Sequence, residues 1–285
     1  MISRVRSALA LAVAVVLVSA CVASGRSPQP PAQARRIVSL VPSLTEDLFA
    51  IGAGAAVIAV TQADDYPPQV KRLPAVASFS SVNNEGIVRL HPDAVVGIPP
   101  QERLTAPLRA GGIATVFFRD DSFEDIFSAI SGLGALTGRS HAAQRLIASL
   151  HRQTLQLQHG IGARGHEPSV LVVINARPII VAGKRSFISK MLELGGAKNA
   201  AASVPQPYPT LSAEALLREQ PDAVVTDDQT QLTAVLDQEP WRSLRAVRAR
   251  RIFILDKRHT DVFERPGPRY NEGLSWLIDR LRTLP

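Results

Sequence analysis

The stretch Glu85-Gly-Ile-Val-Arg-Leu-His-Pro-Asp-Ala-Val-Val96 decides the fold, because it returns later in the chain as Glu214-Ala-Leu-Leu-Arg-Glu-Gln-Pro-Asp-Ala-Val-Val225. Both copies keep the glutamate, the arginine and the run Pro-Asp-Ala-Val-Val at the same spacing. Each copy predicts a short helix that ends before the proline and is followed by a buried strand. A duplicated order of helix and strand predicts two similar lobes built on parallel α/β sheets.

Other predicted elements flank the two copies in the same order. Each copy is preceded by an opening strand and an amphipathic helix closed by glycines, and is followed by a later strand. These elements are predicted at Arg36 to Val41, Glu46 to Gly54 and Gly112 to Phe118 for the first lobe, and at Ser169 to Asn175, Ile188 to Ala197 and Arg251 to Leu255 for the second. The stretch Ser43 to Glu46 has the spacing of a capping box, with Ser43 at the N-cap.

A helical segment is predicted between the lobes. Phe123 to Gln158 is rich in alanine, leucine and isoleucine at helical spacing, and its glycines predict a shorter helix followed by a long one from about Ser140. Because the segment contains no proline, we expect a stiff spine that bridges the lobes and little domain closure. The expected divisions are 1–20 signal peptide, 21–34 tether, 35–121 first lobe, 122–160 spine and 161–285 second lobe.

The first residues are typical of an export signal. Arg4 and Arg6 precede an apolar run from Ala8 to Val18, which is too short to span a bilayer. Small residues then lead to Cys21, the only cysteine, as in a bacterial lipoprotein signal. The alternative is an ordinary signal peptide with a cysteine there by chance. We expect an exported protein in the periplasm or at the cell surface, lipid-anchored through Cys21 and a proline-rich tether.

Charge and composition do not indicate a nucleic-acid partner. The formal charge is +7, and +5 without the two arginines of the signal. The densest basic cluster, Arg242 to Arg251, has no interleaved aromatic side chains for base stacking, so a solvated helix face is the better interpretation. We expect no nucleic-acid binding, and a monomer that touches the membrane only through its lipid.

Motifs for catalysis and cofactor binding are absent from the sequence. The glycines Gly52 and Gly54 follow a predicted helix instead of opening one, and Gly183-Lys184 lacks the earlier glycine of a phosphate loop. No nucleophile elbow or His-Glu-x-x-His pair occurs, and the six histidines are scattered. We therefore expect no catalytic residue, no metal site, no intrinsic cofactor and no enzyme activity.

Several stretches resemble one known family. They are Arg36 to Glu46, Asp65-Tyr-Pro-Pro68, Ala182-Gly-Lys184, Leu192 to Gly196, and Asp261-Val-Phe-Glu-Arg-Pro-Gly-Pro-Arg269. The chain resembles the periplasmic cobalamin-binding proteins of type II ABC importers, within the wider class that also binds ferric siderophores and haem. The likeness runs over nearly all of residues 35–284. It implies two α/β lobes bridged by a long helix, with cobalamin carried as the transported ligand in the cleft between them.

The resemblance also implies the ligand-binding residues. Tyr66 and Tyr208 keep aromatic positions that face the corrin ring, and Phe79 stands where cobalamin binders have tryptophan. Asp261 and Arg265 match polar contacts to the edge of the ligand. Rings supply contact area and a few charges fix orientation, as a large flat ligand requires. Two family aromatics are replaced, by Gly97-Ile98 and by Ile180.

Glu85 and Glu214 occupy equivalent places in the repeat. The resemblance implies that one glutamate on each lobe docks onto arginines of the transmembrane subunits of the transporter. The alternative is a helical ion pair with the arginine four residues on, worth only a few tenths of a kcal/mol.

Two other functions stay open. The same fold could carry a ferric siderophore, for which Arg185, Arg265 and Arg269 are the candidate residues, or haem, for which Tyr66, Tyr208 and His259 are candidate axial ligands. A different class is a secreted α/β hydrolase, which would need an activated nucleophile beside a base.

Overall fold

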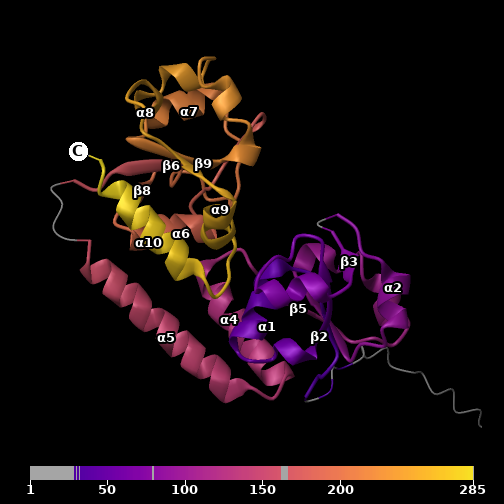
Figure 1. Cartoon of the computed structure of the whole chain (residues 1–285). Coiled ribbons are helices and arrows are strands. Elements are labelled where there is room, and N and C mark those ends of the chain that lie inside the picture. The colour runs from indigo at the N-terminus through magenta and orange to yellow at the C-terminus, as the bar shows by residue number, and fades with distance from the viewer. Residues whose placement is uncertain (1–28, 30, 32, 79, 162–165, 285) are drawn as a thin grey trace, which may run out of the picture.

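The chain forms two α/β lobes joined by helices (Figure 1). The computed structural model describes residues 29, 31, 33–78, 80–161 and 166–284. The predicted signal segment and Cys21 lie outside the described residues. In the part of the chain that the structure describes, no helix is both long and apolar enough to cross a bilayer.

The N-terminal lobe is built on a five-stranded parallel sheet with the strand order β3-β2-β1-β4-β5. Its strands are β1 (Ile37–Ser39), β2 (Val57–Thr61), β3 (Ala75–Ala77), β4 (Ala94–Gly97) and β5 (Thr115–Phe117). Its helices are α1 (Pro42–Ala50), α2 (Asn84–Arg89) and α3 (Ala106–Ala110), with short 3₁₀ turns at Gly54–Ala56, Pro68–Arg72 and Pro99–Gln101. The prediction of a parallel α/β lobe is confirmed.

The C-terminal lobe repeats this design with one exception. Its sheet has the order β10-β9-β6-β7, and β8 pairs with β6. The strands are β6 (Ser169–Ala176), β7 (Ile179–Val181), β8 (Lys198–Asn199), β9 (Ala223–Asp227) and β10 (Ile252–Leu255); the helices are α6 (Phe187–Leu194), α7 (Ala213–Glu219), α8 (Arg245–Arg248), α9 (Lys257–Glu264) and α10 (Tyr270–Leu281). Short 3₁₀ turns lie at Asp228–Thr230, Thr233–Val235 and Trp241–Ser243. Strand β7 is antiparallel to β6 because only Arg177 and Pro178 connect them, and so short a connection can only form a hairpin.

The sequence repeat has a structural counterpart in each lobe. Helices α2 and α7 precede strands β4 and β9, as predicted. In the first lobe the Asp93 carboxylate accepts hydrogen bonds from the backbone N–H groups of Arg35 and Arg36, at 2.8 and 3.0 Å. In the second lobe Asp222 accepts one from Ser169 at 2.8 Å. The repeated aspartate therefore ties the start of the neighbouring strand to the sheet in both lobes.

The first helix does not begin where the sequence predicts. Helix α1 starts at Pro42, its N-cap is Val41, and no side chain caps it, so the capping box of Ser43 and Glu46 is not formed. Proline suits the first helical position because its fixed φ is helical and its missing N–H would be unpaired there anyway. As a result the Glu46 carboxylate is free to point away from the helix end.

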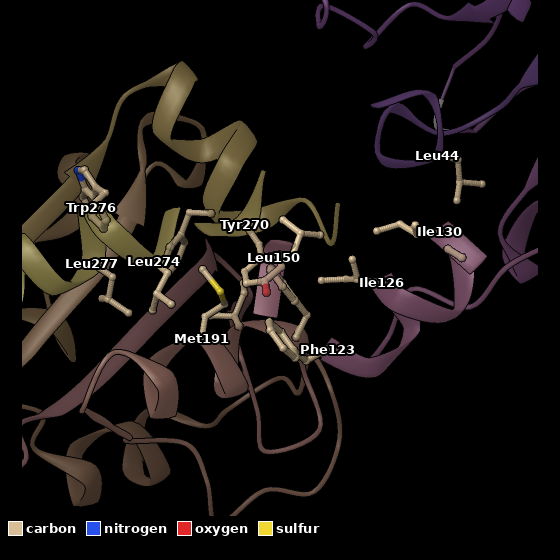
Figure 2. Close-up of a cluster of buried hydrophobic side chains, with 14 of the residues drawn as sticks. Leu44, Phe123, Ile126, Ile130, Leu150, Met191, Tyr270, Leu274, Trp276 and Leu277 are labelled. Carbon is tan, nitrogen blue, oxygen red and sulfur yellow. The ribbon is translucent and has the colours of Figure 1, made fainter. Parts of the chain in front are cut away.

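The helices between the lobes are α4 (Phe123–Leu136) and α5 (Ser140–His159), as predicted. Helix α4 packs against α1 of the first lobe and α6 of the second, while α5 runs beside α10 (Figure 1). Figure 2 shows buried side chains of both lobes in one cluster, from Leu44 through Ile126 and Ile130 to Leu274 and Leu277. The lobes therefore share a hydrophobic core through α4, which supports the expectation of little domain closure.

Candidate functional site

Tyr66 and Tyr208 are aromatic side chains left open to solvent. Each is 44% exposed, and among the described residues they are the only aromatics in the set of exposed large apolar side chains. Tyr66 belongs to the N-terminal lobe and Tyr208 to the C-terminal lobe. Uncovered aromatic rings on a folded protein often mark a binding surface. The two tyrosines are therefore the starting point of the candidate site.

A network of charged side chains crosses between the lobes beside Tyr66. The Glu46 carboxylate, only 2% exposed, accepts hydrogen bonds from Arg269 Nε at 2.8 Å, from Arg269 Nη2 at 2.7 Å and from Arg265 Nη1 at 3.1 Å. Arg265 Nη1 also donates to Asp65 Oδ1 at 2.9 Å. These contacts join α1 and the loop after β2 to the segment between α9 and α10. A buried carboxylate shared by two arginines fixes the lobes against each other.

Lys257 and Asp261 extend this network toward solvent. Lys257 Nζ lies 2.6 Å from Asp65 Oδ2 and 3.0 Å from Asp261 Oδ2, and Asp261 Oδ1 lies 2.6 Å from Arg265 Nη2. Burial opposes ionisation of Asp65, but the hydrogen bonds from Lys257 and Arg265 outweigh it and hold the pKa of that carboxyl below its ordinary value. Asp261 and Arg265, predicted to contact the ligand, thus bind each other, and Arg265 also binds the opposite lobe.

Tyr66 itself is held by the network. The Arg269 guanidinium carbon lies 3.9 Å from the centroid of the Tyr66 ring, which is a close cation–π contact. A cavity of about 530 Å³ opens there, and its lining includes Asp65, Tyr66 and Arg269. One face of Tyr66 is therefore occupied by an arginine of the other lobe.

Tyr208 lies among acidic side chains. Withdrawal of its hydroxyl from water, with repulsion from Asp120, Glu264 and Asp121, raises the pKa of Tyr208 to about 12. Burial, reinforced by Asp227 and Asp261, raises the pKa of Glu264 to about 8. Glu264 Oε1 is shielded from solvent and accepts no hydrogen bond from the residues that the structure describes. Near neutral pH this part of the site therefore holds a protonated carboxyl next to negative charge.

We expect the substitution Glu264→Gln to remove a pH dependence of stability. The pKa of Glu264 is about 8 in the folded protein against an ordinary 4.5, so between these values the folded state holds a proton that the unfolded state lacks. The contribution of Glu264 to the free energy of unfolding is complete below about pH 4.5 and is lost as the pH rises through 8. Urea unfolding should show the wild type losing about 4 kcal/mol relative to the variant between pH 5 and pH 9. If the difference in unfolding free energy between the wild type and the variant is the same at pH 5 and pH 9, Glu264 ionises as an exposed carboxylate does.

The two repeat glutamates are exposed on their lobes. Glu85 is in the first turn of α2, where its carboxylate lies 4.0 Å from Arg89, and the Glu85 side chain is 90% exposed. Glu214 is in the first turn of α7, and within the described part of the chain it forms no ion pair with Arg218. The alternative of a helical ion pair is thus a loose contact in one copy and is missing from the other.

The remaining predicted residues fall outside this arrangement. Phe79 lies outside the described residues. His259 Nδ1 lies 2.8 Å from Asp256 Oδ1, and the His259 ring lies beside Trp276. Both rings line a groove between α5, α9 and α10 whose lining includes neither Tyr66 nor Tyr208. A Cβ on Gly97 would lie 2.6 Å from Gln101 Oε1, so a larger side chain there would require Gln101 to move. Among the described residues, no group of three or more acidic, histidine or cysteine side chains is placed to hold a metal.

Sequence reasoning missed three residues of the site. Glu46 was assigned to a helix cap, Arg269 was considered only as a siderophore contact, and Glu264 was given no role. The partners of Glu46 are 219 and 223 residues away in sequence, so no local spacing could show the pairing. The signal that was available is Pro42, which favours the first helical position and so excludes Ser43 as the cap.

Comparisons with known proteins agree on the kind of protein. A family model described as periplasmic binding protein matches residues 37–259. The lipoprotein YvrC of Bacillus subtilis strain 168, named as an ABC transporter substrate-binding lipoprotein, is 31% identical over 255 residues, covering 87% of this chain and 80% of YvrC.

Two solved structures have the same fold and different printed ligands. The periplasmic vitamin B12 binding protein BtuF of Vibrio cholerae matches with a TM-score of 0.73 and 27% identity, over 88% of this chain and 98% of that one. The periplasmic haem-binding protein RhuT from Roseiflexus sp. RS-1 matches with a TM-score of 0.76 and 27% identity, over 86% and 97%.

Proposed function

This chain belongs to the periplasmic binding protein family, and from that premise we propose that it is the substrate-binding protein of an ABC importer and captures a cobalamin-type corrinoid. The observation that carries the proposal is the pair of half-exposed tyrosines, one on each lobe and each 44% exposed. A large flat ligand placed between the lobes would cover both rings and recover their apolar area. We expect binding without catalytic turnover.

The acidic surroundings of Tyr208 favour a corrinoid over haem. Haem bound through the Tyr208 oxygen needs a phenolate, and the burial and the neighbouring carboxylates that raise the pKa of Tyr208 oppose that form. The propionates of haem would also be repelled by Asp120 and Asp121 if they lay beside Tyr208. The amide groups on a corrin ring are neutral and donate hydrogen bonds, which carboxylates accept well. The negative charge beside Tyr208 also disfavours siderophores that carry several carboxylates.

We further propose that the protein is exported and anchored to a membrane by lipid on Cys21. The support is the small-residue cleavage pattern before that cysteine and the similarity to the lipoprotein YvrC. The protein would then work as a monomer tethered to a membrane, in the periplasm or at the cell surface.

Glu85 and Glu214 are proposed to dock the two lobes onto the transmembrane subunits. Reversing both charges to lysine should abolish uptake in cells while leaving the dissociation constant for the ligand within about twofold. Exposed charges at the rim of an interface affect how fast the protein meets its transporter and in which orientation it docks, and they do not touch the ligand. Binding would be measured by titration and uptake with labelled ligand. The matched control is Glu219→Lys, a charge reversal at the other end of α7. Normal uptake by the double variant would contradict the docking role.

The test of the function is isothermal titration of the soluble body, from Arg35 onward. Cyanocobalamin, haem and a panel of ferric siderophores would be compared under one set of conditions. One-to-one binding of cyanocobalamin alone is the expected result. Binding of haem or a siderophore instead would keep the transport role and overturn the corrinoid assignment, whereas binding of none would contradict the proposed cargo classes altogether.

A further inference from the structure

Arg269 is held more tightly than an ordinary surface arginine. It lies at the N-terminus of α10, and its guanidinium makes two parallel hydrogen bonds to the Glu46 carboxylate, at 2.8 and 2.7 Å. The side chain of Arg269 is 14% exposed and that of Glu46 is 2% exposed. Paired hydrogen bonds between a guanidinium and a carboxylate fix the plane of the guanidinium as well as its position.

The fixed guanidinium stacks on Tyr66. Its carbon is 3.9 Å from the centroid of the ring, so the two groups are in direct contact. The residue before Tyr66 is held as well, since Arg265 donates to Asp65 at 2.9 Å and to the same Glu46 at 3.1 Å. Tyr66 sits on the N-terminal lobe, but the group that covers one face of its ring comes from the C-terminal lobe. Tyr66 as a whole remains 44% exposed to solvent.

We propose that Arg269, oriented by Glu46, is a positioning residue that holds the Tyr66 ring at a set angle and so presents its open face to a flat ligand. The proposal rests on the proposed function for the identity of that ligand. A ring held in its bound orientation before the ligand arrives loses less conformational entropy on binding. Arginine is needed because lysine keeps the charge but can neither pair with both carboxylate oxygens in one plane nor stack on the ring.

A double-mutant cycle tests this role. Titration with cyanocobalamin would compare the wild type, Arg269→Lys, Tyr66→Ala and the combination of both. We expect Arg269→Lys to weaken binding about tenfold when Tyr66 is present and less than twofold when Tyr66 is alanine. An equal loss in both backgrounds would overturn the proposal, because it would mean that Arg269 acts through the fold or touches the ligand itself.

A second measurement does not depend on any ligand. The chain has three tyrosines, so NMR of protein labelled only at tyrosine rings gives few signals, and Tyr66→Phe assigns one of them. Arg269→Lys should shift the Tyr66 ring signals and speed the flipping of the ring, with the Tyr208 signals unchanged. Unchanged Tyr66 signals would overturn the proposal. If the wild type binds no cyanocobalamin, the proposed function fails while this measurement still decides whether Arg269 orients the ring.

Arg280→Lys is the matched control. Arg280 lies on the same helix, α10, and its guanidinium carbon is 5.7 Å from the centroid of the Trp276 ring. The substitution removes an arginine–aromatic contact of the same kind on a different face. We expect unchanged ligand affinity and unchanged Tyr66 signals. A loss of affinity equal to that of Arg269→Lys would show that α10 in general, and not Arg269, supports binding.

Discussion

Replacing Tyr66 and Tyr208 together with alanine is expected to weaken cyanocobalamin binding about a thousandfold. A tyrosine covered by a ligand contributes its ring as apolar area, and a central aromatic contact is commonly worth about 2 kcal/mol or more. Two such contacts on opposite lobes amount to about 4 kcal/mol, or about three powers of ten in the dissociation constant. Both side chains are 44% exposed, so the fold should survive their loss. Isothermal titration of the two single variants and the double variant measures the effect.

Phenylalanine at both positions is the control for this experiment. It keeps the rings and removes the hydroxyl groups, so affinity should stay within about threefold of the wild type if stacking is the main contribution. Urea unfolding of the alanine variant should lie within about 1 kcal/mol of the wild type. An alanine variant that folds normally and binds cyanocobalamin as tightly as the wild type would contradict the placement of the ligand on the two tyrosines.

Replacing Glu46 with alanine is expected to lower the free energy of unfolding by about 3 kcal/mol or more. Arg265 and Arg269 have side chains only 18% and 14% exposed, and both donate hydrogen bonds to this carboxylate. Removing one partner from a buried ion pair leaves the remaining charges without compensation, which costs more than the pair contributes net. Urea denaturation gives the change as a shift of the unfolding midpoint.

The matched control is Glu272→Ala. Glu272 also pairs with an arginine, Arg258, at 3.4 Å, but the two side chains are 44% and 76% exposed. Exposed pairs are worth little, so we expect a change below about 0.5 kcal/mol. Equal effects of the two substitutions would show that the contacts of Glu46 between the lobes add nothing beyond an ordinary surface pair.

The lobes could be predicted from the sequence because the information is local and occurs twice. In each copy a proline ends the helix, an aspartate follows it and a buried strand comes next, and the structure gives Asp93 and Asp222 the same task of holding the neighbouring strand. The break between α4 and α5 was predictable too, since Gly138 adopts a φ of +68°, which glycine accepts at a helix end.

The contacts between the lobes could not be predicted in this way. Glu46 and Arg269 are 223 residues apart, and Tyr66 and Arg269 meet only because two separate sheets place their loops side by side. The antiparallel β7 was missed for a simpler reason. A connection of two residues, Arg177 and Pro178, is too short for the crossover that a parallel strand needs. The apolar run that forms β7 is itself so short that its sequence does not indicate whether the strand is parallel or antiparallel. The ligand residues came from resemblance, since exposure of Tyr66 and Tyr208 depends on what the fold leaves uncovered.

The hydrophobic core that runs through α4 has a consequence for how the molecule is put together. Leu44 near the start of the described chain belongs to the same buried cluster as Leu274 near its end (Figure 2). Ile37 and Leu281 are members of this cluster as well. The buried cluster that begins in the first lobe is therefore not complete until the last helix has been made. We therefore expect the two lobes to unfold as one cooperative unit, in which neither half melts separately.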